Sequence, residues 1–183
     1  IIRSVAAQAT VAYGGGGDAD VSLRVIADHL RAIAFLVAEG IIPGPEKRGA
    51  VLRRIMRRAM RHGRLLGAPS PFLWRHLEDV ASALGEPYPE LREHLGTMQK
   101  VVRREEERFD RTLAEGFALL DARIDAVLGE GSRHFPGGEA FQLESERGLP
   151  MDLVRDALEE RGLALDESAY EAARARHVET SRV

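Results

Sequence analysis

The chain has 183 residues, of which 44% are apolar and 30% charged, as in a soluble globular protein with room for one large domain or two small ones. It has no cysteine, which excludes disulfide bonds and thiolate metal sites. No apolar run approaches the roughly 20 residues of a membrane span, so we expect no membrane partner. The 26 basic and 29 acidic residues give a net charge of −3, so overall charge does not by itself indicate a nucleic-acid partner.

The first forty residues predict two helices. Residues 1–11 are apolar enough for a short helix, and the glycine run at 14–17 ends it. Because glycines have no side chains with which to order themselves, this run predicts a flexible loop. We expect Asp20 to cap the next helix, residues 21–39, whose apolar residues recur at helical spacing before Gly40 ends it.

A strongly basic helix follows at residues 47–64, where eight of eighteen residues are Lys or Arg. At about 100° per residue, one side of the helix is apolar and the other basic. The basic side consists of a ridge of Arg53, Arg57, Arg61 and Arg64, with Arg54 and Arg58 beside it and Lys47 and Arg48 at its start.

No acid occurs between Lys47 and Arg75, so nothing within this helix neutralises the ridge. Solvated helix faces usually mix signs, although a solvated arginine face is the simplest alternative. Outside the helix the chain has 18 basic and 29 acidic residues, a net charge of −11. We therefore expect the basic face to meet an anionic partner, either a phosphate backbone, which suits the planar arginine fork, or an acidic protein surface.

The middle of the chain predicts two more helices. Residues 72–84 form one, with Ser70 as its cap and Trp74 as a core anchor in preference to a stacking platform. The longest pattern runs over residues 90–128, where a continuous helix would span ~58 Å. Within it, Glu105–Glu107 beside Arg103–Arg104 predict a mixed-sign surface, to which we assign no chemistry.

The composition changes at residues 129–138, where we expect a loop and the start of a second unit. Helices are predicted at 139–146, at 151–161 and after Asp166, with at most a minor strand pair near 129–138. The predicted fold is all-α: a multi-helix bundle with one long helix in residues 1–128, and a smaller helical subdomain in residues 129–183.

Catalytic and metal-binding signatures are missing from the sequence. The six histidines occur singly, with no H-x-x-x-H or H-E-x-x-H pair. There is no nucleophile elbow and no Walker loop. From the residues alone we interpret the chain as a helical binding module that is not an enzyme.

Particular segments closely resemble alanyl-tRNA synthetases, in the order that the family has them. They are residues 21–32 (VSLRVIADHLRA), 48–63 (RGAVLRRIMRRAMRHG) with Leu-Leu-Gly at 65–67, 105–109 (EEERF) with Thr-Leu at 112–113, and 148–153 (GLPMDL). The resemblance implies the helical middle region of the enzyme, between the class II catalytic domain and the editing domain. In the family this region reads the G·U pair of the tRNA acceptor stem, so the implied partners are that stem and the two adjoining domains.

The resemblance also implies which chemistry lies elsewhere. The parent is a cytoplasmic ligase that uses ATP with Mg and carries zinc in its editing domain, but the class II motifs and the zinc-binding histidines are not in this chain. We therefore expect no cofactor and no catalytic residue here. Because the chain begins at Ile1 without a methionine or a signal-peptide pattern, we expect it to be cut from a longer protein.

The family's two residues at the G·U pair are an Asp and an Asn. The Asp corresponds to Asp152, and Arg64 stands where the Asn is expected, so these two are the predicted base-reading residues. The predicted phosphate contacts are the remaining cations of the basic helix: Lys47, Arg48, Arg53, Arg54, Arg57, Arg58 and Arg61. Residues 143–147 (LESER) also depart from the family's L-Y-D-T-Y, which affects the segment before the turn that presents Asp152.

Two other functions fit the same pattern. One is a free-standing helical adaptor that binds nucleic acid without sequence preference. The other is a protein-interaction module whose arginine face meets an acidic partner; a membrane-surface helix is a weaker third, because the apolar side is needed for the core. A change of affinity when G·U is replaced by G·C in one stem would separate stem reading from both.

Overall fold

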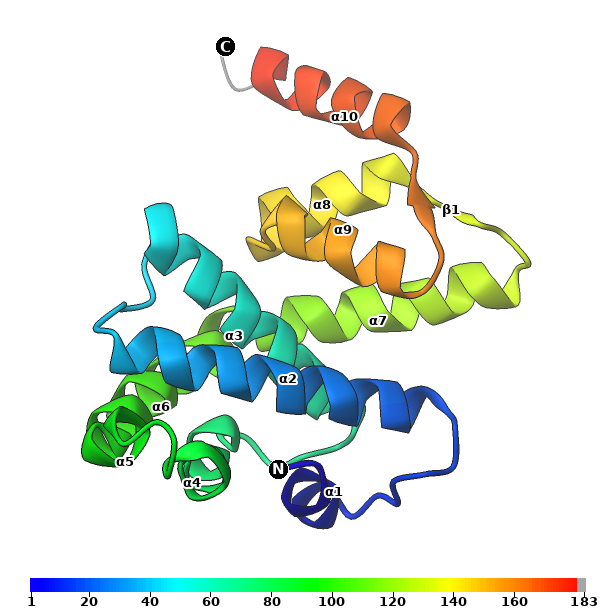
Figure 1. Cartoon of the computed structure of the whole chain (residues 1–183). Helices are drawn as coiled ribbons and strands as arrows, with labels where there is room; N and C mark the ends of the chain where they lie inside the picture. Colours follow the sequence, from blue (N-terminus) through cyan, green and yellow to red (C-terminus); the bar gives the residue numbers. More distant parts are fainter. Residues whose placement is uncertain (181–183) are drawn as a thin grey trace. The chain divides into compact units, whose positions relative to one another are not determined.

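The computed structural model describes residues 1–180, which form ten helices and two strands of two residues each (Figure 1). The chain divides into two compact units, Ile1–Arg111 and the part from Thr112 onward. The boundary between the two units falls after Arg111, inside the helical stretch 90–128. The sequence predicts the boundary after residue 128, where the composition changes. The all-α prediction is confirmed.

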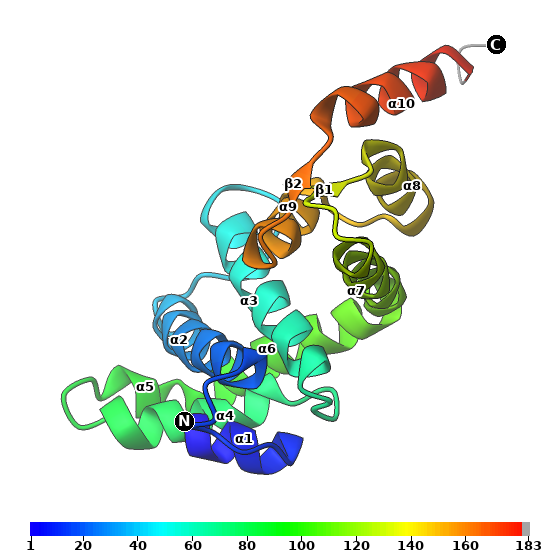
Figure 2. The same cartoon turned by 90° about the vertical axis from the view of Figure 1, so that its right-hand side faces the viewer.

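The first unit is built around a long apolar helix. Its helices are α1 (Ile2–Ala9), α2 (Asp18–Ala38), α3 (Lys47–Leu65), α4 (Leu73–Leu84), α5 (Glu90–Glu93) and nearly all of α6 (Leu95–Thr112). Helix α2 packs along α3 and also contacts α1, α4 and α5 (Figures 1 and 2). The buried stripe of α2 includes Leu23, Ile26, Leu30 and Ile33, each with no exposed surface. Burying each such side chain contributes about 1.5–3 kcal/mol, so this stripe is the main support of the unit.

The backbone of the glycine run before α2 is hydrogen bonded to a side chain of that helix. Asp20 does not cap α2, which begins at Asp18. Its carboxylate instead accepts hydrogen bonds from the backbone N–H of Gly14 (2.9 and 3.1 Å) and Gly16 (2.7 Å). The Gly14 and Gly16 N–H groups hold the pKa of Asp20 below its usual value, because they stabilise the ionised form.

The single long helix expected over residues 90–128 is three helices in the structure. The backbone leaves helical geometry at His94 (φ −100°, ψ 6°) and at Leu113 (φ −127°, ψ −18°), which separate α5, α6 and α7. The apolar period continues through both breaks, and for that reason the sequence pattern does not reveal them. Neither break falls at a glycine of this stretch, since Gly96 lies within α6 and Gly116 within α7.

The second unit contains α7 (Ala114–Gly129), β1 (His134–Phe135), α8 (Gly137–Arg147), α9 (Met151–Glu160), β2 (Ala164–Leu165) and α10 (Glu167–Thr180). The two strands pair in parallel, with His134 opposite Ala164 and Phe135 opposite Leu165. The sequence allows a minor strand pair near residues 129–138. β1 lies in that range, but its partner β2 lies outside it. The core of this unit is apolar and comes from α7, β1 and α9: Phe117, Leu120, Ile124, Phe135, Leu153 and Val154.

Candidate nucleic-acid interface

The arginine ridge of α3 meets a carboxylate of α6. Glu105 Oε1 lies 3.1 Å from Arg53 Nε and 3.3 Å from Arg57 Nη2. The two arginine side chains are only 16% and 12% exposed, and that of Glu105 is 6% exposed. Burial lowers the pKa of Arg57, and the charge of Glu105 opposes that effect. The anion expected to neutralise this part of the ridge is therefore an internal one.

The exposure of the other cations divides α3 along its length. Arg61 is buried at 3% exposure, and Arg58 is half-buried. The exposed cations of the helix are Lys47, Arg48, Arg54 and Arg64. The expectation that the whole basic side faces outward is wrong for Arg53, Arg57 and Arg61, because α3 buries more of its circumference than its apolar stripe alone would cover.

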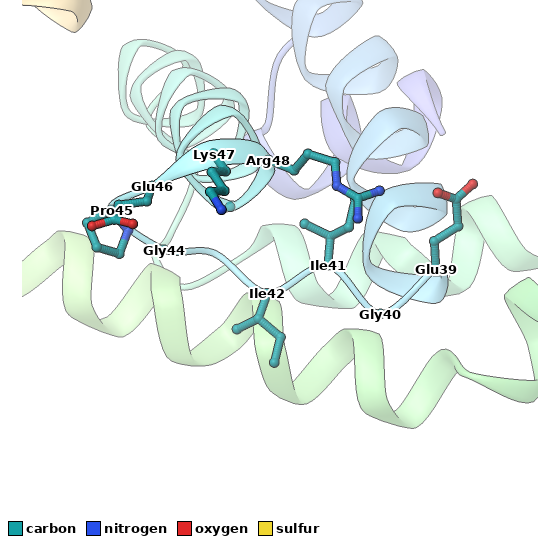
Figure 3. A pocket seen from close by; sticks show the side chains of 10 residues that line it. Glu39, Gly40, Ile41, Ile42, Gly44, Pro45, Glu46, Lys47 and Arg48 are labelled. Carbon is teal, nitrogen blue, oxygen red and sulfur yellow. The ribbon is translucent and has the colours of Figure 1, made fainter.

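The first turn of α3 borders a shallow pocket of about 390 Å³ (Figure 3). The segment from Gly40 to Gly44 forms its other side, and Lys47 and Arg48 at the start of the helix also line it (Figure 3). Gly49 lies so close to this segment that a Cβ atom would come within 2.7 Å of the Ile42 carbonyl oxygen. The close approach fixes the start of the helix, and both cations, against the preceding turn.

The C-terminal half of α3 is held from two sides. His62 is buried, and its Nδ1 lies 3.0 Å from the Ser22 hydroxyl of α2. A Cβ atom on Gly63 would meet the Phe72 ring at 2.2 Å, so the helix and this ring are in close contact. Arg64 comes directly after this anchored pair and is exposed. Its position on the surface is therefore set by its neighbours.

A second carboxylate of α6 caps α4. Glu106 Oε1 accepts hydrogen bonds from the N–H groups of Phe72 and Leu73, both at 2.8 Å, and Oε2 accepts one from Trp74 at 3.1 Å. Burial raises the pKa of Glu106 to about 7, although these three N–H groups favour the ionised form. Ser70, the cap expected from sequence, instead donates its hydroxyl hydrogen to Asp110.

Trp74 is half-buried in the first unit, so it meets the expectation of a core anchor only in part. The guanidinium carbons of Arg75 and Arg103 lie 5.2 and 5.4 Å from its ring centroid. At these distances both cations are attracted to the ring.

Asp152 occupies the first turn of α9 and is exposed. The turn before it is well defined: Gly148 ends α8 in the left-handed region (φ 66°), and Leu149 is fully buried. Leu149 packs onto Gly116 of α7, where a Cβ atom would come within 3.0 Å of it. This turn fixes the start of α9 and therefore the position of Asp152 within the second unit.

Residues 143–147 form the C-terminal part of α8. The Tyr170 hydroxyl donates a 2.6 Å hydrogen bond to Glu144, and Arg147 lies 3.4 Å from Glu115. Burial, together with this bond to Glu144, raises the pKa of Tyr170. Residues 143–147 are therefore helical to the end of α8, and they contact α7 and α10.

Within residues 1–180, the histidines do not gather into a metal site. In the part of the chain that the structure describes, no group of three or more His, Asp or Glu side chains could hold a metal ion. His76 is buried and hydrogen bonded to Gln8, Ser4 and Asp79, which joins α1 to α4. Burial acts to raise the pKa of Asp79, but the bonds with His76 and Ser4 outweigh it and hold that pKa below its usual value.

Sequence reasoning missed Glu105 and Glu106 because it assigned both to a mixed-sign surface. A signal for their positions was present: they share the helical spacing of Met98, Val102 and Phe109, the buried residues of α6. Carboxylates on an apolar stripe indicate buried groups with internal partners.

No helix of the described residues is long and apolar enough to cross a lipid bilayer.

Comparison with known proteins places the chain in a class of enzymes. Residues 1–183 match the family model described as tRNA synthetases class II (A), and the chain belongs to this family. The similar curated proteins are alanine–tRNA ligases. That of Nitratidesulfovibrio vulgaris is 45% identical over 172 residues, 94% of this chain and 20% of the relative.

Two further relatives carry the same name. The alanine–tRNA ligase of Desulfosudis oleivorans is 43% identical over 182 residues, 100% of this chain and 21% of the relative. That of Delftia acidovorans is 48% identical over 152 residues, 83% of this chain and 17% of the relative. The resemblance to alanyl-tRNA synthetases is thus confirmed, and the chain spans about 20% of the length of the relatives that it matches.

Proposed function

We propose that this chain is the tRNA acceptor-stem recognition region of an alanyl-tRNA synthetase, between the class II catalytic domain and the editing domain. It would serve the attachment of alanine to its tRNA by holding the stem and reading the G·U pair. In this proposal, ATP with Mg, and zinc, act in other parts of a cytoplasmic parent enzyme.

The observation that carries the proposal is the exposed set of cations on α3. Lys47, Arg48 and Arg54 face solvent, while Arg53 and Arg57 are held by Glu105. A backbone of phosphates is a suitable partner for such a set, because phosphate contacts position a nucleic acid without reading its sequence. Arg53 and Arg57 would have to leave Glu105 to reach a phosphate, so we assign them to holding α3 on α6. Arg58 is half-buried and Arg61 is buried, so a phosphate contact by either in this proposal would require its side chain to move outward.

Base reading is assigned to Asp152, with Arg64 at the position of the family's Asn. A carboxylate can accept hydrogen bonds from base N–H or amino groups, and it repels phosphates. The wide, shallow minor groove of an A-form stem is the side on which such contacts are possible. Asp152 and α3 belong to different compact units, and each contact is proposed by itself.

The test is a titration of the 183-residue chain with one acceptor-stem minihelix RNA carrying either G·U or G·C. We expect the G·U stem to bind more tightly. Asp152→Ala should reduce that preference by ~1–3 kcal/mol, the worth of a good base contact, and leave the affinity for G·C nearly unchanged. Glu159→Ala removes an exposed acid from the same helix and serves as the control. Equal binding of both stems by the unaltered chain would contradict base reading.

A further inference from the structure

The solvent face of α6 has a different charge from the one that its sequence suggests. The helix contains five cations (Lys100, Arg103, Arg104, Arg108, Arg111) and four acids (Glu105, Glu106, Glu107, Asp110). Glu105 and Glu106 are 5% and 1% exposed and have their partners inside the unit. All five cations are exposed, against only the half-buried Glu107 and Asp110. The outer face of α6 is therefore clearly basic.

Three of these cations form a stripe along the helix. Lys100, Arg104 and Arg111 follow one another at helical spacing and extend over about 16 Å of helix axis. Lys100 and Arg104 lie about 100–140° around the helix from Glu105, so the stripe points away from α3. Within residues 1–180, none of the three takes part in an ion pair.

Arg103, which precedes Arg104 of the stripe, lies next to Trp74 of α4. The Arg103 guanidinium carbon lies 5.4 Å from the Trp74 ring centroid, and that of Arg75 lies 5.2 Å from it. Arg103 is also paired with Glu107 at 3.0 Å, but the two side chains are 56% and 42% exposed. An exposed ion pair of this kind stabilises the fold little, so a phosphate could replace Glu107 at small cost.

We propose that this surface, the α6 stripe with Arg103, Arg75 and Trp74, is a second RNA-binding surface, separate from the start of α3. Its ligand is the phosphate backbone of the bound tRNA. The inference rests on the proposed function, and it adds a contact that holds RNA without reading bases.

The charge and the side-chain chemistry of this surface favour RNA as its partner. Arginines present planar forks that fit phosphate oxygens, and the surface carries four of them beside one lysine and one tryptophan. Arginines next to an aromatic ring, as Arg75 and Arg103 are to the half-buried Trp74, are typical of surfaces that hold nucleic-acid strands. The cations of this face attract a polyanion. Because the rest of the chain is net acidic, that attraction is confined to basic surfaces such as this one.

The test uses Lys100→Glu/Arg104→Glu in the 183-residue chain, with binding of the G·U and G·C minihelices followed over a range of salt concentrations. If each cation holds one phosphate, the slope of log K against log salt should fall by roughly 1.4–1.8, and both stems should lose affinity alike. Arg3→Glu/Arg24→Glu reverses two exposed charges on α1 and α2 and is the matched control for net charge. Lys100→Gln/Arg104→Gln repeats the test without introducing acids.

The fluorescence of Trp74 gives an independent signal for binding, because the sequence contains a single tryptophan. Binding of RNA at Arg75 and Arg103 should change its fluorescence, with the same concentration dependence as the binding itself, and the change should be lost in the double variant. If the double variants bind as the Arg3/Arg24 control does, this inference is wrong and the proposed function is untouched. If the unaltered chain binds neither stem, the proposed function fails, and this inference fails with it.

Discussion

Glu105 of α6 lies 3.1 Å from Arg53 of α3, and the same carboxylate oxygen lies 3.3 Å from Arg57. One buried acid therefore holds Arg53 and Arg57 on the neighbouring helix, while Arg48, Arg54 and Arg64 of α3 face solvent. In the proposed function this difference matters, because Arg53 and Arg57 would have to leave Glu105 before either could meet a phosphate.

Replacing Glu105 tests the internal role of this pair. Glu105→Gln leaves two largely buried guanidinium groups without their counter-charge, and we expect a loss of about 3 kcal/mol in the free energy of unfolding. Denaturant unfolding monitored by circular dichroism measures it. Glu107→Gln is the control, since Glu107 is 42% exposed and its pair with Arg103 should contribute less than about 1 kcal/mol. Equal effects of the two changes would contradict the internal role.

Glu106 should make stability depend on pH. Its pKa is about 7 in the folded protein against 4.5 as the ordinary value, so the folded state binds the proton more tightly than the unfolded state. The stabilisation by the protonated form is complete below about pH 4.5 and is lost as pH rises through about 7. We expect the unfolding free energy, relative to that of Glu106→Gln, to fall by about 3 kcal/mol across this range.

The measurement for Glu106 is a series of unfolding curves from pH 4.5 to 7.5, for the unaltered chain and for Glu106→Gln. The difference between the two cancels the titration of other groups. A difference that does not vary with pH would show that the Glu106 pKa is not raised.

The contact between Gly63 and Phe72 should make Gly63 intolerant of any side chain. Alanine in a helix is favoured over glycine by up to about 1 kcal/mol, but a Cβ atom here would lie 2.2 Å from the Phe72 ring. Phe72 is 2% exposed and its N–H is bound by Glu106, so the ring cannot move aside easily. We expect Gly63→Ala to cost about 1–3 kcal/mol of unfolding free energy.

Gly96 provides the control for Gly63. It lies in α6, and a Cβ atom there would meet nothing within 4 Å. Gly96→Ala should therefore leave stability unchanged or raise it by up to about 1 kcal/mol. Thermal unfolding compares the two variants, and a stabilising Gly63→Ala would show that the contact is looser than the structure has it.

The helices of this chain could be predicted from its sequence, because apolar residues recur at helical spacing in α2, α3 and α9. The breaks at His94 and Leu113 could not, since the apolar period runs through them. Nor could the sequence separate the exposed cations of α3 from the internal ones. That separation depends on Glu105, 52 positions after Arg53, and such long-range pairing leaves no mark on local periodicity.

The isolated chain should have no ligase or editing chemistry of its own. We expect the purified 183-residue chain to give no alanine-dependent ATP–pyrophosphate exchange and no deacylation of mischarged tRNA, because the motifs for both reactions are missing from its sequence. A full-length alanine–tRNA ligase in the same assays is the positive control. Exchange by the isolated chain would place catalytic residues within it and contradict the proposed role.

The start of α3 should hold phosphates without selecting between stems. Lys47 and Arg48 are exposed and fixed beside the Gly40–Gly44 segment (Figure 3), so each is placed to meet one phosphate. In Lys47→Ala/Arg48→Ala, the slope of log K against log salt should fall by roughly 0.7–0.9 for each phosphate that is no longer bound. The affinities for the G·U and G·C stems should fall by the same factor, because phosphate contacts carry no base information.

Two comparisons make this prediction specific to the start of α3. Arg3→Ala/Arg24→Ala removes the same charge from exposed positions on α1 and α2 and should leave the salt slope close to that of the unaltered chain. Asp152→Ala should also leave the slope nearly unchanged while it reduces the preference for G·U. If the Lys47/Arg48 variant keeps the full salt slope, the start of α3 does not contact the stem, and the phosphate contacts must come from other cations of the chain.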